Sequence, residues 1–303
     1  MRRLVLITLL GSIAQLVDGT LGMAYGVTAT TALLITGITP AVASASVHLA
    51  EVGTTLASGL SHWRFGNIDW RVVALIGLPG GVGAFAGATF LSGLSTESAS
   101  VWVACLLALL GVYLLVRFAT GKVRAVVPGK VGGRFLGPLG LFAGFIDATG
   151  GGGWGPVATS SLLGSGKLEP RKTVGSVSAA EFVVAIAASA GFLIGLRNQS
   201  IPFGIVGALL IGGVIAAPLA AWLVSRLPTR WLGVGVAGVL ILTNSRTVLS
   251  GIEAPDGFRY LVYAGVLAAW TAVVVRGFRT GRVAEPVAVE TPVAKELETA
   301  TPR

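Results

Sequence analysis

Long apolar segments constrain this chain more than any other feature. Turn and charge signals separate nine of them, at about 4–35, 40–62, 72–94, 101–118, 134–163, 172–196, 201–225, 230–249 and 258–276. A helix needs about 20 apolar residues to cross a bilayer. Only 12% of the residues are charged and 53% are hydrophobic, which is too little polar surface for a water-soluble globule. The pattern predicts an all-α integral membrane protein with eight to nine hydrophobic segments and excludes a soluble enzyme.

The charge balance agrees with a membrane protein. The formal net charge is +9, but the cations lie in short loops between apolar segments, as the cytoplasmic loops of membrane proteins do. No nucleic-acid partner is expected; the expected partners are the lipid bilayer and a small anionic substrate. With one cysteine, Cys105, and two histidines, the chain is expected to hold no metal site and no cofactor.

An internal repeat divides the chain. Residues 18–31 match residues 147–160 at six of 14 positions, and residues 44–51 match residues 174–181 at four of eight, at offsets of 129 and 130. We therefore predict a transmembrane repeat at 1–120, a cytoplasmic basic linker at 121–133 and a second four-segment repeat at 134–250. An extra transmembrane helix at 258–276 and a disordered cytoplasmic tail at 277–303 complete the chain.

Loop charge indicates that the two repeats are inverted. If the first segment of each repeat enters and returns on one side, 17 Lys and Arg fall on one side of the membrane and five on the other. Gly19, Gly22 and Gly26 interrupt the first such segment, and five Gly and one Pro within 150–156 interrupt the second. Glycine and proline weaken helices, and broken helices at the midplane are typical of secondary transporters. Two parallel repeats of plain helices plus a ninth helix are the alternative.

Four acidic residues lie inside apolar segments, and the repeat equates Asp18 with Asp147 and Glu51 with Glu181. A carboxylate at the bilayer centre costs about 2.5–3.5 kcal/mol. These acids therefore either hold the fold by pairing with a neighbouring helix or backbone amide, or bind a coupling ion or proton. His48 shares a helix face with Glu51. Because imidazole titrates near neutral pH, His48 is a further proton candidate, or else a hydrogen-bonded structural residue.

The broken segments suit a small anion. Half-helix N-termini present unpaired N–H groups and a partial positive charge, and glycine lets a ligand approach the backbone. Threonine hydroxyls add donors, and aromatic rings can wall the site. Asp18 and Asp147 would repel an anion if they were ionised and aimed at it, but they can instead cap the half-helices. The candidate substrate-binding residues are Thr20, Gly22, Tyr25, Ser46, Thr149, Gly150, Gly151, Gly152, Trp154 and Ser176.

Four stretches carry a family resemblance: residues 15–26, 46–51, 61–67 and 144–156. They resemble the TauE/SafE family of sulfite exporters, also called the toluene sulfonate uptake permease family, and the similarity covers about residues 1–250. The resemblance implies a multi-pass permease of the plasma membrane of a bacterial-type cell. It also implies a small sulfur-containing anion such as sulfite, sulfoacetate or another organosulfonate. These motifs specify the family well and the substrate poorly.

The expected function is a secondary transporter of a small sulfur-containing oxyanion, with the buried acids offering proton coupling. The alternatives are an anion or proton channel, a transporter of another small organic anion, and an intramembrane enzyme or assembly factor. An enzyme would need a nucleophile–base pair or a metal set, and no such set stands out in the sequence. The run at 150–155 also lacks the Lys-Ser/Thr ending of a nucleotide loop, so an ATP-driven pump is not expected. The sequence leaves open whether the protein forms a homo-oligomer.

Overall fold

The computed structural model is helical over the residues that it describes, which are 2–21, 23–120, 129–224 and 229–279. Within these ranges, the side chains at 19–21, 218, 220–224, 229–232 and 278–279 are not described. The described residues form eleven α-helices and one π-helical turn, η1, and no strand occurs among them. Residues 121–128 of the predicted linker and 280–303 of the predicted tail lie outside the described residues.

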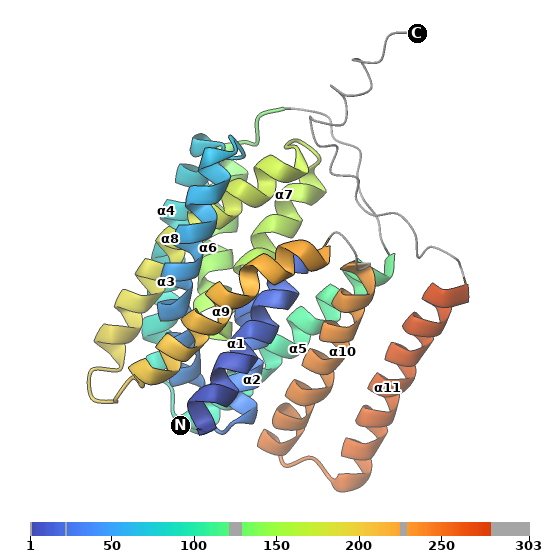
Figure 1. Cartoon of the computed structure of the whole chain (residues 1–303). Coiled ribbons are helices and arrows are strands. Elements are labelled where there is room, and N and C mark those ends of the chain that lie inside the picture. The colour runs from blue at the N-terminus through green and yellow to red at the C-terminus, as the bar shows by residue number, and fades with distance from the viewer. Residues whose placement is uncertain (1, 22, 121–128, 225–228, 280–303) are drawn as a thin grey trace.

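The helices follow the predicted segments (Figure 1). The first half contains α1 (Arg2–Leu21), α2 (Tyr25–Ile35), α3 (Pro40–Arg64), α4 (Trp70–Gly93) and α5 (Thr96–Thr120). The second half contains α6 (Gly133–Gly150), η1 (Gly155–Thr159), α7 (Ser160–Ser165), α8 (Pro170–Gly195), α9 (Phe203–Val224) and α10 (Thr229–Gly251). The last helix is α11 (Asp256–Arg279), which packs mainly on α10.

Five helices are long and apolar enough to cross a membrane: α4, α5, α8, and the greater parts of α10 and α11. Large apolar side chains cover their outer faces, including Leu78, Val82 and Ile194, each at least 60% exposed. A water-soluble protein rarely exposes so large an apolar surface, whereas lipid covers it without penalty. The chain is therefore a multi-pass membrane protein, while the number of eight to nine crossings stays a prediction.

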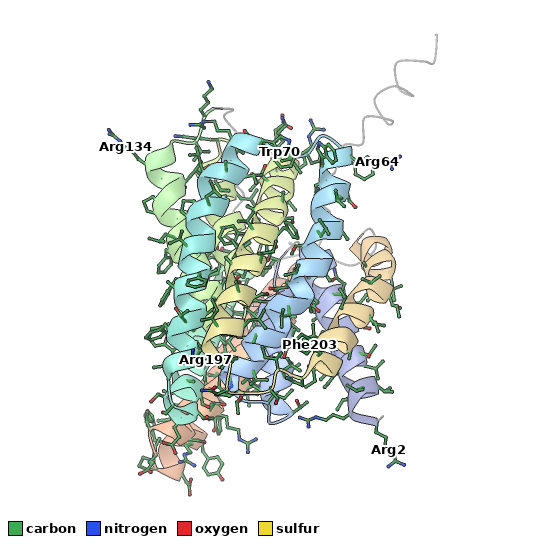
Figure 2. The ribbon with its side chains drawn as sticks, turned by 90° about the vertical axis from the view of Figure 1, so that its left-hand side faces the viewer. Arg2, Arg64, Trp70, Arg134, Arg197 and Phe203 are labelled. Atoms are coloured by element: carbon green, nitrogen blue, oxygen red, sulfur yellow. The ribbon has the colours of Figure 1, made fainter. Side chains whose placement is uncertain are left out.

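The helical bundle has two ends, which Figure 2 marks with labelled residues. Arg64, Trp70 and Arg134 lie at one end, called here the Arg64 end. Arg2, Arg197 and Phe203 lie at the opposite end, called here the Arg197 end (Figure 2). Since α3 ends at Arg64 and α4 begins at Trp70, these two helices run in opposite directions through the full thickness of the bundle.

The first segment of each half is broken and turns back. In the first half, α1 ends at Leu21, and Ala24 has a left-handed backbone with φ 98° immediately before α2. In the second half, the backbone φ at 151–153 is 67°, 145° and 157° before η1 begins. Because α6 starts near Arg134 and the Lys167 carbonyl accepts a 3.0 Å hydrogen bond from the Gly129 amide, this second segment starts and ends at the Arg64 end.

Glycines let the broken segments pack closely on the full-length helices. A Cβ atom at Gly83 of α4 would collide with the Leu141 carbonyl oxygen of α6, and one at Gly212 of α9 would collide with the Thr8 carbonyl oxygen of α1. The two glycines are 129 residues apart, which is the offset of the sequence repeat. A similar backbone-to-backbone contact, shifted by about one helical turn, therefore holds the broken segment in each half.

This contact gives a stability prediction. We expect Gly83→Ala to destabilise the folded protein by about 1–3 kcal/mol, because the added methyl group forces α4 and α6 apart. A thermal melt in detergent, followed by size-exclusion chromatography, measures the loss. Gly93→Ala on the same helix is the matched control, since its Cβ would meet no atom within 4 Å. Equal melting curves for the two variants would contradict the close contact.

Candidate functional site

The two aspartates of the repeat occupy equivalent positions at the helix breaks. Oδ1 of Asp18 accepts a 3.1 Å hydrogen bond from the Tyr25 amide. Oδ1 of Asp147 accepts a 2.8 Å hydrogen bond from the Trp154 amide, and both bonds span seven residues. Each carboxylate thus satisfies an amide at the start of the returning half-helix, where unpaired N–H groups gather. The sequence left open whether Asp18 and Asp147 cap the half-helices. In the structure, the Oδ1 atoms of both residues make such capping hydrogen bonds.

The two breaks meet each other inside the bundle. A Cβ atom at Gly26, in the first turn of α2, would lie 2.6 Å from the Gly152 Cα. The Thr30 hydroxyl of α2 donates to the Gly151 carbonyl oxygen. Only residues without a Cβ allow this approach of backbone to backbone. The glycines of the two repeats therefore place two irregular stretches, more than 120 residues apart in sequence, in direct contact.

His48 joins the first repeat to the break of the second. Its Nδ1 lies 2.9 Å from Glu51 Oε2 and 3.8 Å from Asp147 Oδ2, and its Nε2 lies 3.3 Å from the Asp147 carbonyl oxygen. A carbonyl oxygen only accepts hydrogen bonds, so Nε2 carries the hydrogen in that contact. Nδ1 and Oε2 thus form a close contact between an imidazole and a carboxylate, which Asp147 Oδ2 adjoins. All three side chains are buried.

Glu181 occupies the position in α8 that Glu51 occupies in α3, but its surroundings differ. Ser178, not a histidine, stands three residues before it. Glu181 is half-buried, and no hydrogen bond or ion pair joins its carboxylate to the described residues. Its carboxylate lines the cavities described next. The repeat thus places one carboxylate in a buried contact with His48 and the other beside the cavities.

Two small polar cavities lie where the breaks meet α3 and α8. One has a volume of about 30 Å³ and is bordered by both breaks. The other, of about 70 Å³, shares Asp18, Tyr25, Glu51, Ser178 and Glu181 with it. A water molecule needs about 10–15 Å³ on this measure, so the space suits a few water molecules or a very small ion. Among the described residues, no Lys or Arg lines either cavity.

The structure gathers part of the predicted site around these cavities. The predicted residues that line them are Asp18, Tyr25, Glu51, Asp147, Gly152 and Glu181. His48 does not line the cavities but contacts Glu51, which does. Gly151 precedes the lining residue Gly152 and accepts a hydrogen bond from Thr30. The Tyr25 hydroxyl donates to the Leu209 carbonyl oxygen of α9 at 3.3 Å. This hydrogen bond holds the Tyr25 ring beside the cavities that it lines.

Other predicted residues lie away from the cavities. The hydroxyls of Ser46 and Thr149 donate to carbonyl oxygens of their own helices, and Ser176 accepts a 2.8 Å hydrogen bond from the Asp69 amide in the loop before α4. Gly150 ends α6 and lines neither cavity. Trp154 is buried, and its indole nitrogen donates to the Val177 carbonyl oxygen. The Thr20 side chain and Gly22 lie outside the described residues.

Several lining residues were not predicted as site residues. They include Met23, Ala24, Gly153, Gly155 and Pro156 at the breaks, and Gln15, Thr54, Thr55, Ser58, Val177 and Ser178 along the helices. Met23 and Ala24 are apolar, so composition gives no signal for them, whereas Gly153, Gly155 and Pro156 belong to the run of glycine and proline that predicts the break. The lining residues on α3 could have been predicted from helical spacing, because Thr55 and Ser58 continue the polar face of Glu51 by one and two turns.

The comparisons with known proteins agree with this architecture. The family model described as sulfite exporter TauE/SafE matches residues 7–247. The chain is 48% identical over 277 residues to the "Probable membrane transporter protein YtnM" of Bacillus subtilis (strain 168), covering 91% of this chain and 92% of that protein. It is 24% identical over 197 residues to the "Probable membrane transporter protein YdhB" of the same organism, covering 62% of this chain and 79% of that protein. No solved structure matches the chain significantly. Two broken helical segments that meet in a multi-pass bundle, together with the match over residues 7–247, show that this chain is a membrane transporter of the TauE/SafE sulfite exporter family.

Proposed function

We propose that the protein is a secondary transporter of a small sulfur-containing oxyanion, such as sulfite or a small organosulfonate. The observation that carries this proposal is the contact between the two glycine-rich breaks beside the polar cavities. Irregular backbone at membrane depth is tolerated where it lines a cavity. Half-helix N-termini attract anions there without a buried cation, which suits a site whose described lining holds no Lys or Arg.

The small volume of the cavities favours an alternating-access carrier over an open channel. Spaces of about 30 and 70 Å³ hold water but no continuous wide pore. A carrier that closes around its site passes through such narrow states, because the repeats rock against each other around the binding site. The broken, paired segments are the elements that this motion would rearrange.

We further propose that the two repeats are inverted in the plasma membrane, with the Arg64 end in the cytoplasm. The supporting observations are the reversed course of equivalent helices and the pairing of equivalent elements. The first segment starts at the Arg197 end, whereas its equivalent α6 starts at the Arg64 end (Figure 2). α4 packs along α6 as α9 packs along α1, while α3 pairs with α8 and α5 with α10. A two-fold axis in the membrane plane produces this pattern.

Topology is tested by reporters at both chain ends. We expect a C-terminal reporter to be active in the cytoplasm and an N-terminal one to be accessible from outside, because 17 of the 22 Lys and Arg fall on the proposed cytoplasmic side. Insertions at the exposed positions Gly66 and Asn198 serve as internal controls for the two sides. Two ends on one side of the membrane would contradict the inverted arrangement.

Proton coupling follows from the charges around the cavities. Four carboxylates, from Asp18, Glu51, Asp147 and Glu181, line the cavities, and His48 is the one basic side chain shown bound to them among the described residues. Adding an anion to several ionised carboxylates in a medium of low dielectric constant is strongly unfavourable. We therefore propose that the anion enters together with protons that neutralise part of this cluster.

Uptake into proteoliposomes tests the function. The assay compares radiolabelled sulfite, a taurine-like sulfonate and sulfate, each with and without a pH gradient. Saturable uptake of sulfite or the sulfonate that a pH gradient accelerates supports the proposed carrier. A linear, voltage-dependent current would instead identify a channel, and no flux of any of the three anions would overturn the proposed substrate class.

A further inference from the structure

The polar face of α3 continues from Glu51 toward the Arg64 end. Thr55, Ser58 and His62 follow Glu51 at spacings of four, three and four residues, which keeps them on one helix face. At 1.5 Å per residue, this face covers about 16 Å of the helix. The 70 Å³ cavity runs along part of it, since Thr55 and Ser58 line that cavity together with Glu51 and Glu181.

The donors on this face leave acceptor positions for water. The Thr55 hydroxyl donates to the Glu51 carbonyl oxygen at 2.6 Å, so its oxygen lone pairs are free to accept. Gln15 of α1 borders the same cavity from the opposite side. Nδ1 of His62 is buried and has no hydrogen-bond partner among the residues that the structure describes. A buried polar atom without a protein partner normally bonds to water, so this nitrogen offers a hydrogen-bonding position for water one turn beyond Ser58.

The equivalent face of α8 is apolar and closed. The repeat offset of 130 equates Thr55, Ser58 and His62 with Ala185, Ala188 and Phe192. These three α8 residues are each at most 1% exposed. Phe192 stacks on the His48 ring with centroids 6.0 Å apart, so it covers the buried contact of His48 with Glu51 from the Arg197 side. The helices α3 and α8 are therefore equivalent in the repeat, but only α3 carries a polar face, which runs toward the Arg64 end.

Glu181 is placed to exchange protons through this one polar side. Its carboxylate lines the 70 Å³ cavity together with Thr55 and Ser58. The titratable groups that border the same space are Asp18, Tyr25 and Glu51, with Asp147 and His48 adjoining them. Glu51 is held by His48, whereas no described residue pairs with the Glu181 carboxylate. Glu181 thus borders the cavity along α3 with a carboxylate unpaired among the described residues, whereas Asp18 accepts a hydrogen bond from the Tyr25 amide.

We propose that α3 carries a one-sided water path for protons, running from His62 past Ser58 and Thr55 to Glu181, with no equivalent path along α8. The proposal rests on the proton coupling proposed above. The path admits water and protons and connects the acid cluster to the Arg64 end. The apolar α8 face separates the same cluster from the Arg197 end in this conformation.

Cysteine accessibility tests the path independently of transport. In a Cys105→Ser background, Ser58→Cys and Ala188→Cys occupy equivalent positions on the two faces. Sealed vesicles of either orientation are exposed to silver ions, and unreacted thiols are then counted with a fluorescent maleimide after denaturation. We expect Ser58→Cys to react from the Arg64 side at least about tenfold faster than Ala188→Cys from either side, because thiol reactivity follows access. Similar rates for the two variants, or an unreactive Ser58→Cys, would overturn the proposal.

A second test replaces residues of the polar α3 face with the residues found at the equivalent positions of α8. Thr55→Ala with Ser58→Ala installs the residues of the α8 face on α3. We expect this pair to slow pH-gradient-driven uptake about tenfold more than it slows exchange of the anion at equal pH, since removing the hydroxyls interrupts proton transfer more than anion binding. An equal fall in both rates would assign these hydroxyls to anion binding and overturn the path. If no anion is transported by the unaltered protein, the function fails while the silver experiment still decides the path.

Discussion

Glu181→Gln is expected to abolish uptake driven by a pH gradient while the protein still inserts and folds. Glutamine keeps the size and hydrogen-bonding capacity of the side chain but does not take up a proton. Since no described residue pairs with the Glu181 carboxylate, the exchange breaks no structural contact. The expected fall in the initial rate is on the order of a hundredfold, comparable to the loss of a positioned proton-transfer group. Proteoliposome uptake with an imposed pH gradient measures it.

Glu51→Gln gives the informative comparison. The glutamine amide can donate to His48 Nδ1, which lies 2.9 Å from the present Oε2, so the contact between α3 and the second break is retained. The glutamine side chain does not take up a proton, and we expect coupled uptake to be lost with that capacity. Glu169→Gln is the matched control, because that carboxylate lies at the surface, paired with Arg171 and about half exposed. Full coupled uptake in both Glu51→Gln and Glu181→Gln would return these acids to a structural role.

Gly152→Ala is expected to have the largest effect on folding. The backbone φ of Gly152 is 145°, in the region that residues with a side chain avoid. Its Cβ would collide with the Gly26 carbonyl carbon and the Val27 amide nitrogen. The backbone strain costs about 1–3 kcal/mol, and separating the two breaks adds to it. We expect a large fall in thermal stability in detergent and a loss of transport.

The reciprocal variant tests the same contact from the other repeat. A Cβ at Gly26 would lie 2.6 Å from the Gly152 Cα, so Gly26→Ala should reproduce the defect although its own backbone is helical. Gly164→Ala is the control, since its Cβ would meet no atom within 4 Å. A normal melting curve for Gly152→Ala would show that the two breaks are not held against each other, and would remove the observation on which the proposed function depends.

Much of the candidate site was predictable because buried charge and helix breakage have local causes. Asp18, Glu51, Asp147 and Glu181 stand out in apolar segments, and all four line the cavities. The glycines of 150–153 predict a break, and the backbone is left-handed at 151–153. Ser46 and Ser176 show the limit of this reasoning: they are equivalent in the repeat, yet one bonds within its own helix and the other bonds the loop before α4.

The sequence by itself determined that this chain is a membrane protein and predicted its division into two repeats, because hydrophobicity, charge and glycine content act locally along the chain. Tertiary structure alone decided how the equivalent residues differ. His48 reaches Asp147, 99 residues away, only because α3 packs on the second break, and this contact leaves Glu51 paired and Glu181 facing open space. Tertiary packing also closed the α8 face, since Ala185, Ala188 and Phe192 are buried while Ser58 borders a cavity. Such differences depend on contacts between distant segments, which a pattern along one segment does not encode.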